Sequence, residues 1–134
     1  MSASILIADD YEDNRELLRL ILETAGYRVR EARNGRECVE MAREAVPDLF
    51  LIDLSMPVLD GWGALMELRA IAETRDVPCI AITAYDDAGM RGARAASTEE
   101  FDAYITKPFR SKELMETIAR LVEESLARKA LRGA

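Results

Sequence analysis

The chain has 134 residues, a length that fits one globular domain with a single hydrophobic core. Apolar residues make up 49% of it and charged residues 32%, and 25 acidic against 18 basic residues give a formal net charge of −7. This acidic balance argues against binding to DNA or RNA, which needs a positive surface. No apolar stretch approaches the length of a membrane-spanning helix, so no membrane insertion is expected.

The lack of a signal peptide, the positions of the two cysteines and the lack of histidine narrow the possible classes of protein further. The first residues, MSASILIADD, have no basic segment and too short an apolar run for a signal peptide, so we expect a cytoplasmic protein. Cys38 and Cys79 lie in apolar stretches without CxxC spacing and are expected to be reduced thiols in the core. The sequence contains no histidine, which excludes histidine-based catalysis and a phosphohistidine on this chain.

Five short apolar runs alternate with segments of helical period along the chain. The first run is Ser4–Ala8. A helix is predicted after it, with Asp13 and Glu16 at capping-box spacing and Gly26 at its end. The second run, Tyr27–Glu31, alternates apolar and polar residues, which is typical of an edge strand.

The second helix is predicted between Asn34, which has capping-box spacing to Glu37, and Pro47. The third run, Leu49–Asp53, is apolar up to its last residue, as a buried parallel strand is. Asp60 is the predicted N-cap of a third helix. The apolar face of that helix comprises Leu65, Leu68 and Ile71.

The fourth run, Cys79–Thr83, again has the nearly continuous apolar pattern of a buried strand. A helix of small residues is predicted over roughly 87–97. The fifth run is Ala103–Thr106, and a last helix begins near Ser111. Its predicted apolar stripe comprises Leu114, Ile118, Leu121, Val122 and Leu126. Five βα units predict a single α/β domain over 1–134, with a core of about 4–126 and a short tail over 127–134, built on a doubly wound parallel sheet with helices on both faces.

Polar side chains stand where the predicted strands end. Asp9 and Asp10 follow the first strand, Asp53 ends the third, Thr83 ends the fourth, and Lys107 follows the fifth. The carboxyl ends of parallel strands meet at one edge of the sheet, where this architecture binds ligands. Taken alone, each residue has an ordinary explanation as a cap, turn, strand or loop residue, whereas the combination indicates a site.

The chemistry of these residues points to phosphoryl transfer. Three carboxylates in one crevice repel each other, and a hard cation such as Mg²⁺ relieves that repulsion. Between a cation and a lysine, the carboxylate of Asp53 can act as a nucleophile and form an aspartyl phosphate. Lys107 would offset the phosphoryl charge, and the Thr83 hydroxyl would donate to a phosphoryl oxygen.

Four segments, ILIADD, LIDLSMPVLDG, AITA and YITKPF, resemble the signature blocks of response-regulator receiver domains. The resemblance extends from Ile5 to about Leu126. It implies a flavodoxin-like (βα)5 sandwich with strand order 2-1-3-4-5. It also implies a phosphoryl-accepting switch in a two-component system or phosphorelay.

The match to the family motif implies a role for each acidic residue. Asp53 is the implied phosphoacceptor, and Asp9 and Asp10 form the acid pocket, with Asp10 as a direct Mg²⁺ ligand. Ser55 would offer its backbone carbonyl to the metal. The family pattern thus assigns Mg²⁺ as the cofactor, held by Asp9, Asp10, Asp53 and Ser55.

The resemblance also implies how a signal leaves the site. Thr83 and Lys107 would contact the phosphoryl group, and the bond between Lys107 and Pro108 is expected to be cis. Thr83 would move toward the phosphoryl group and Tyr104 would rotate inward behind it. A half-buried aromatic at the sheet edge is the other interpretation of Tyr104. The implied output face is the fourth helix, fifth strand and fifth helix.

The implied partners are a histidine kinase or histidine phosphotransfer protein upstream and an unidentified target protein downstream. A phosphorylation-dependent homodimer stays open. Only 127–134 follow the apolar stripe of the last helix, so no effector module is expected there. The chain is then either a standalone response regulator or a receiver from a longer hybrid kinase. We do not expect it to be an enzyme that turns over a separate substrate.

Two other classes of protein compete with this interpretation. An aspartate-nucleophile phosphohydrolase usually has a second aspartate two residues after the nucleophile, where this chain has Ser55. A receiver-like interaction module that ignores phosphate is disfavoured because the acidic pocket, threonine and lysine are all present.

We also interpret two further residues and one further segment of the sequence. Tyr85, two residues after Thr83, is hypothesised to shield the aspartyl phosphate from water. Residues 95–101 form an acidic, glycine-free corner where many receivers have a glycine. This corner either reshapes the surface that partners bind or is a tolerated loop insertion. For Trp62 two interpretations stay open, a fluorescence reporter of metal or phosphate binding and a partly exposed packing residue.

Overall fold

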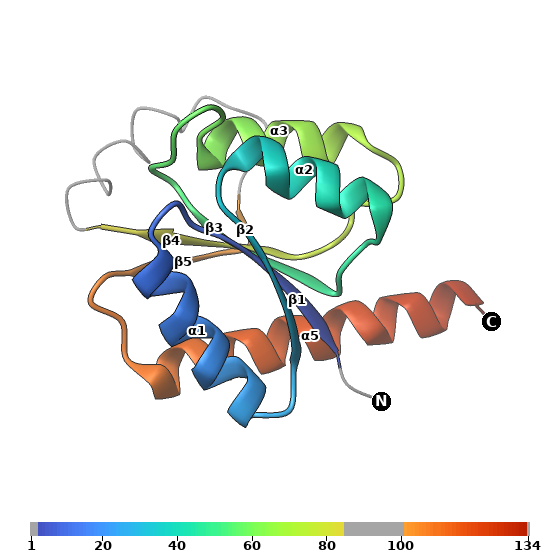
Figure 1. Ribbon diagram of the computed structural model, residues 1–134. Coiled ribbons are helices and arrows are strands. Elements are labelled where there is room, and N and C mark those ends of the chain that lie inside the picture. Colours follow the sequence, from blue (N-terminus) through green and yellow to red (C-terminus); the bar gives the residue numbers. More distant parts are fainter. Residues whose placement is uncertain (1–2, 85–100, 134) are drawn as a thin grey trace.

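The computed structural model describes residues 3–84 and 101–133 as an α/β sandwich (Figure 1). Its strands and helices follow one another in the order expected from the sequence. They are β1 (Ser4–Ala8), α1 (Glu12–Thr24), β2 (Arg28–Ala32), α2 (Gly35–Glu44), β3 (Leu49–Asp53), α3 (Gly61–Ala70), β4 (Cys79–Thr83), β5 (Ala103–Thr106) and α5 (Ser111–Gly133).

The five strands form one parallel sheet with the order β2-β1-β3-β4-β5. Helices α2 and α3 cover one face, and α1 and α5 cover the other (Figure 1). This confirms the predicted flavodoxin-like fold, with β2 at an edge. Strand β2 begins one residue later than predicted, because Arg28, rather than Tyr27, is the residue that pairs with Ser4 of β1.

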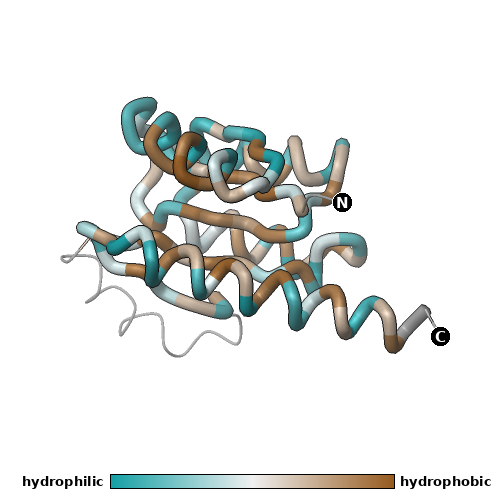
Figure 2. The backbone as a smooth tube through the Cα atoms, turned by 90° about the horizontal axis from the view of Figure 1, so that it is seen from below, coloured by the Kyte–Doolittle hydropathy of each residue, from teal (hydrophilic) through white to brown (hydrophobic). Residues whose placement is uncertain are grey.

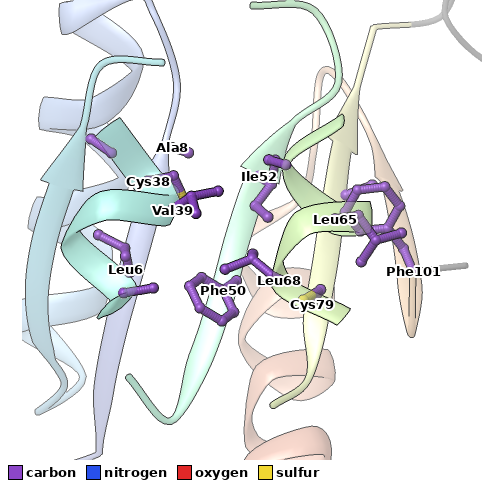
Figure 3. Packing of buried hydrophobic residues seen from close by; sticks show 14 of the residues in the cluster. Leu6, Ala8, Cys38, Val39, Phe50, Ile52, Leu65, Leu68, Cys79 and Phe101 are labelled. Atoms are coloured by element: carbon purple, nitrogen blue, oxygen red, sulfur yellow. The ribbon is translucent and has the colours of Figure 1, made fainter. Parts of the chain in front are cut away.

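The core has two parts, one on each face of the sheet. Beneath α2 and α3, Phe50 of β3 lies between Leu6 and Leu68 (Figure 3). On the other face, Ile7 and Leu51 pack with the buried sides of α1 and α5. Apolar stretches run along the strands, whereas apolar and polar residues alternate along α5 (Figure 2). Burial on both faces explains why β1, β3 and β4 are nearly continuous in apolar residues.

Two of the three predicted helix caps form. The Asn34 side chain accepts from the Glu37 amide at 2.8 Å, and Asp60 accepts from the Gly63 amide at 2.8 Å. The predicted capping box of α1 is wrong: the helix begins at Glu12, and its N-cap, Tyr11, makes no side-chain cap bond. The Asp9 carboxylate binds the Tyr11 amide instead, so the chain turns into the helix earlier than the capping pattern indicates.

The predicted apolar stripe on α5 is correct except at its end. Leu114 and Ile118 are fully buried, whereas Leu126 is 51% exposed and Ser125 takes the buried position. Residues 127–133, expected as a tail, continue α5, whose end projects past the sheet (Figure 1). Lys129 Nζ lies 3.6 Å from Asp48 Oδ1 and ties this end to the start of β3.

Several expectations fall on residues 85–100. The predicted helix over 87–97, the shielding role of Tyr85 and most of the corner over 95–101 lie outside the described residues. Phe101, the last residue of that corner, is described and buried. Among the helices that the structure describes, none is both long enough and apolar enough to span a membrane.

Both cysteines are buried in the core cluster beneath α2 and α3. Burial raises the pKa of the Cys79 thiol to about 12 and raises the pKa of Cys38 as well. Because the thiolate is the reactive form, we expect neither cysteine to react with a thiol reagent at pH 8 in the folded protein, and both to react within minutes in 6 M guanidinium. Rapid labelling under native conditions would contradict this packing.

Candidate functional site

Three aspartates meet at the carboxyl edge of the sheet. Asp9 and Asp10 follow β1 and Asp53 ends β3, and one carboxylate oxygen from each lies within 4.8 Å of the others. Because β1 and β3 are hydrogen-bonded neighbours, the sheet itself brings these residues together. Asp9 and Asp53 are only 2% and 6% exposed, whereas Asp10 is open to solvent. Negative charge is thus concentrated in a partly desolvated crevice.

Lys107, in the connection after β5, is the cation at this cluster. Its Nζ donates to Asp53 Oδ2 at 2.6 Å and lies 3.6 Å from Asp9 Oδ2. The Lys107 amide also donates to the Thr83 carbonyl at 2.7 Å, which fixes the connection to the end of β4. The peptide bond between Lys107 and Pro108 is cis.

Burial and the ion pair shift the pKa of Asp53, and that of Lys107, in opposite directions. Burial raises the pKa of Asp53, and the hydrogen bonds from Lys107 and from the Ser55 amide oppose that rise without cancelling it. Burial also disfavours the charged form of Lys107, but its hydrogen bond to Asp53 and the charges of Asp53 and Asp9 raise its pKa overall. The raised pKa of Lys107 favours its charged form, and a second positive charge beside Asp53 would stabilise the carboxylate against the effect of burial.

Thr83 and Ser55 complete the crevice. The Ser55 amide donates to Asp53 Oδ1 at 2.8 Å and orients the carboxylate. Thr83 is 3% exposed, and its hydroxyl donates to the Ala84 carbonyl at 3.0 Å. Thr83 ends β4 and Ser55 lies just after β3, and because these two strands are paired, both residues lie at the same edge of the sheet as Asp53.

The connection between β3 and α3 is held close to the site by two glycines. A Cβ at Gly61 would lie 2.6 Å from the Asp53 carbonyl oxygen and 2.7 Å from Leu54 Cα. A Cβ at Gly35, the first residue of α2, would lie 2.1 Å from the Leu59 carbonyl oxygen. Only glycine allows these approaches. The connection is thereby packed between the end of β3 and the start of α2.

Tyr104 faces the core on the α3 side of the sheet. Its ring centroid lies 6.3 Å from that of Trp62 and 5.8 Å from that of Phe101, and Trp62 meets Phe101 at 5.3 Å. Trp62 is 2% exposed, so the expectation of a partly exposed tryptophan is wrong. It is buried because the first turn of α3 lies directly against the aromatic rings at β5.

Sequence reasoning missed one buried charge beside the site. Arg15 of α1 is 9% exposed and donates from Nη1 to the Asp9 carbonyl oxygen at 2.7 Å. A signal for it does exist in the sequence. Arg15 lies three residues before Leu18 and seven before Leu22, which places a cation on the apolar face of the helix.

The donor set fits a hard divalent cation. All three candidate ligands are carboxylates, which suit Mg²⁺, and the residues that the structure describes offer no histidine or cysteine to this cluster. Asp9 Oδ2 is buried and accepts no hydrogen bond from the described part of the chain, and its ion-pair partner Lys107 Nζ lies 3.6 Å away. A buried carboxylate oxygen without a donor is costly, and a cation between Asp9 and Asp53 would satisfy it.

Known proteins share this arrangement. The profile of the response regulator receiver domain family matches residues 5–119. The polar-differentiation response regulator DivK of Brucella anthropi is 36% identical over 119 residues, which cover 88% of this chain and 94% of that protein.

Two solved structures of receiver domains from histidine kinases superpose well on the chain. One is from Syntrophus aciditrophicus, with a TM-score of 0.84, 32% identity and coverage of 92% of both chains. The other, PA1611 of Pseudomonas aeruginosa PAO1, has a magnesium ion coordinated in its active site cleft; its TM-score is 0.81 at 32% identity, covering 92% of this chain and 99% of that one.

The fold and the site define a flavodoxin-like α/β domain with an acidic cluster and a lysine at the carboxyl edge of its sheet. The chain belongs to the response regulator receiver domain family. Receiver domains are the phosphorylation-regulated switches of two-component systems, and they bind Mg²⁺ at their acidic pocket.

The second prediction concerns the ion pair. Lys107→Met leaves two buried carboxylates without their cation, so we expect the metal-free protein to lose about 1–2 kcal/mol of unfolding free energy. This is below the roughly 3–5 kcal/mol of a fully buried pair, because Lys107 is partly exposed. Urea denaturation in EDTA measures the loss, and Lys112→Met, at an exposed lysine of α5, is the control. If Lys107→Met lowers the free energy of unfolding by the same amount in an Asp53→Asn background, the ion pair with Asp53 is not responsible for the loss.

The third prediction concerns the backbone of the β3–α3 connection. Val58 has a φ of 70° and is 79% exposed, and the Leu59 amide donates to the Pro57 carbonyl across it at 2.8 Å, which makes a strained γ-turn. We expect Val58→Gly to raise the free energy of unfolding by up to about 1 kcal/mol, because relief of strain exceeds the added chain entropy. Val58→Ala, which keeps the Cβ, should gain less. A Val58→Gly protein no more stable than Val58→Ala in urea denaturation would contradict the strain.

Proposed function

We propose that the Asp53 carboxylate of this receiver domain accepts a phosphoryl group from a phosphohistidine of a histidine kinase or histidine phosphotransfer protein. An Asp53 carboxylate oxygen forms the new P–O bond while the P–N bond to the histidine breaks, and the electron pair returns to the imidazole. The observation that carries the proposal is the convergence of Asp9, Asp10 and Asp53 with Lys107 at one sheet edge. Preorganised charge of this kind is the main catalytic device in phosphoryl transfer.

The residues around Asp53 support defined roles in this transfer. Mg²⁺ held by Asp9, Asp10, Asp53 and the Ser55 carbonyl would supply positive charge to the phosphoryl oxygens. Lys107 balances negative charge at Asp53 Oδ2 and orients that carboxylate through its hydrogen bond. The same groups would permit self-phosphorylation from small donors and self-dephosphorylation, without turnover of a separate substrate.

A groove beside the site supports access for a donor. Its volume is about 340 Å³, and it runs between α1 and the connection from β5 to α5. Asp9 and Lys107 of the site line it, together with apolar residues that include Leu17, Ile21 and Phe109. We propose that the donor protein docks over this groove, next to the acidic cluster.

We infer that the signal leaves through Thr83 and Tyr104. Thr83 donates to its neighbouring carbonyl, a bond that it can exchange for one to a phosphoryl oxygen. Tyr104 pairs with Ala81 of β4, two residues before Thr83 and on the same face, so movement of Thr83 changes the packing of the tyrosine. Such a local change shifts an existing equilibrium between two conformations. We propose that target proteins read it at β5, α5 and the neighbouring segment.

The domain organisation proposed is one receiver over 1–134, acting through a cytoplasmic partner protein. Both a standalone regulator, like the DivK relative, and a receiver of a hybrid kinase, like the two histidine-kinase domains, are compatible with the match over residues 5–119.

The fourth prediction tests the phosphoacceptor. Incubation with acetyl phosphate and Mg²⁺ should add the mass of one phosphoryl group to the intact protein, and EDTA should prevent the addition. Asp53→Asn should remove it, whereas Asp48→Asn, at the opposite end of β3, should not, because Asp48 binds the Ser4 amide far from the cluster. No mass gain in the wild-type protein, with no binding of beryllofluoride either, would favour the phosphate-independent interaction module.

A further inference from the structure

Arg15 is a buried cation that the proposed phosphoryl transfer does not use. Besides the Asp9 carbonyl, it binds the carboxylate of Glu31 on β2, through Nε to Oε1 at 3.2 Å. Only 9% of the residue is exposed. A buried charge is costly unless it is paired and hydrogen-bonded, so both contacts of Arg15 are needed to hold it on the apolar face of α1.

The carbonyl that Arg15 binds belongs to the peptide unit between Asp9 and Asp10. The Asp9 amide donates to the Ala32 carbonyl at 3.1 Å, and Asp9 Oδ1 accepts from the Tyr11 amide at 2.8 Å. Together with the hydrogen bond from Arg15, these contacts fix both the amide and the carbonyl group of Asp9. The orientation of this peptide unit sets the directions in which the Asp9 and Asp10 side chains leave the backbone.

Glu31 holds Arg15 in place from the neighbouring strand. Its second oxygen, Oε2, accepts from Nη1 of Arg19, one turn further along α1. Arg19 Nε also lies 3.4 Å from Oε1 of Glu23. The two arginines and Glu31 thus connect α1 to β2 behind the acidic pair, and only Arg15 of the two arginines donates to the Asp9 carbonyl.

We propose that Arg15 is a positioning residue for the Mg²⁺ site, which it serves by holding the Asp9–Asp10 peptide unit through the Asp9 carbonyl. The inference rests on the proposed function, because it requires that the acidic cluster binds Mg²⁺. The carboxylates of Asp9, Asp10 and Asp53 repel one another, and the peptide unit would turn to relieve that repulsion if nothing held it. Residues that orient metal ligands typically account for about 10–100-fold in metal affinity.

Charge and positioning predict opposite effects, which makes the inference testable. Replacing Arg15 by an uncharged residue makes the protein more negative, and on charge alone Mg²⁺ should then bind more tightly. If Arg15 positions the aspartates, Mg²⁺ should bind more weakly instead. Arg19 is the matched control, because it carries the same charge and binds the same Glu31 without contacting the Asp9 carbonyl.

The fifth prediction is the result of Mg²⁺ titrations by calorimetry on the full chain. Arg15→Met should raise the dissociation constant about tenfold. Arg19→Gln should leave it within about twofold or lower it, as expected for loss of a charge alone. A value for Arg15→Met equal to or tighter than that of the wild-type protein would overturn the inference, and no Mg²⁺ binding by the wild-type protein would overturn the proposed function itself.

A double variant keeps the test valid if Arg15→Met, which takes from Glu31 one of its two arginine partners, unfolds the protein. Arg15→Met/Glu31→Met removes both partners, keeps the formal net charge at −7 and leaves no unpaired buried charge. Its Mg²⁺ affinity should also fall about tenfold, because the Asp9 carbonyl again lacks its donor. Affinity at the wild-type level in this folded variant would contradict a positioning role.

Discussion

The repulsion among three carboxylates at one sheet edge is the constraint on which the rest of the structure depends. Asp9 and Asp53 are almost fully buried, and Lys107 is the described cation that contacts both. Parallel pairing of β1 with β3 brings the aspartates together, and β4 with β5 brings the lysine to them. The energy needed to keep these charges close comes from two apolar clusters on the faces of the sheet, away from the site.

Rigid contacts surround this charged edge on the side of α2 and α3. The β3–α3 connection lies against the Asp53 backbone through Gly61 and against α2 through Gly35. Beyond it, Trp62 and Phe101 pack against Tyr104, which connects the start of α3 to β5. A change at Asp53 therefore meets packed backbone and aromatic rings, and close-packed contacts of this kind transmit small displacements. Under the proposed function, these contacts would carry a change at Asp53 toward Tyr104.

Features that depend on local periodicity could be predicted from the sequence. Four of the five strands have the predicted bounds, because apolar runs such as Leu49–Asp53 are buried on both faces. The caps at Asn34 and Asp60 form as their spacing indicates. The start of α1 could not be predicted in this way, because the Asp9 side chain binds the Tyr11 amide and competes with the capping pattern further along.

The sequence by itself determined the order of the elements, the family and the residues at the ends of the strands, because each of these follows from residue type and short-range spacing. The tertiary structure decided the position of Arg15, the burial of Trp62 and the exposure of Leu126. Each of these depends on which distant segment lies opposite: Glu31 of β2 faces Arg15, and Phe101 faces Trp62. Such pairings arise only when the sheet and its two helix layers assemble, since burial is a property of the whole core and not of one segment.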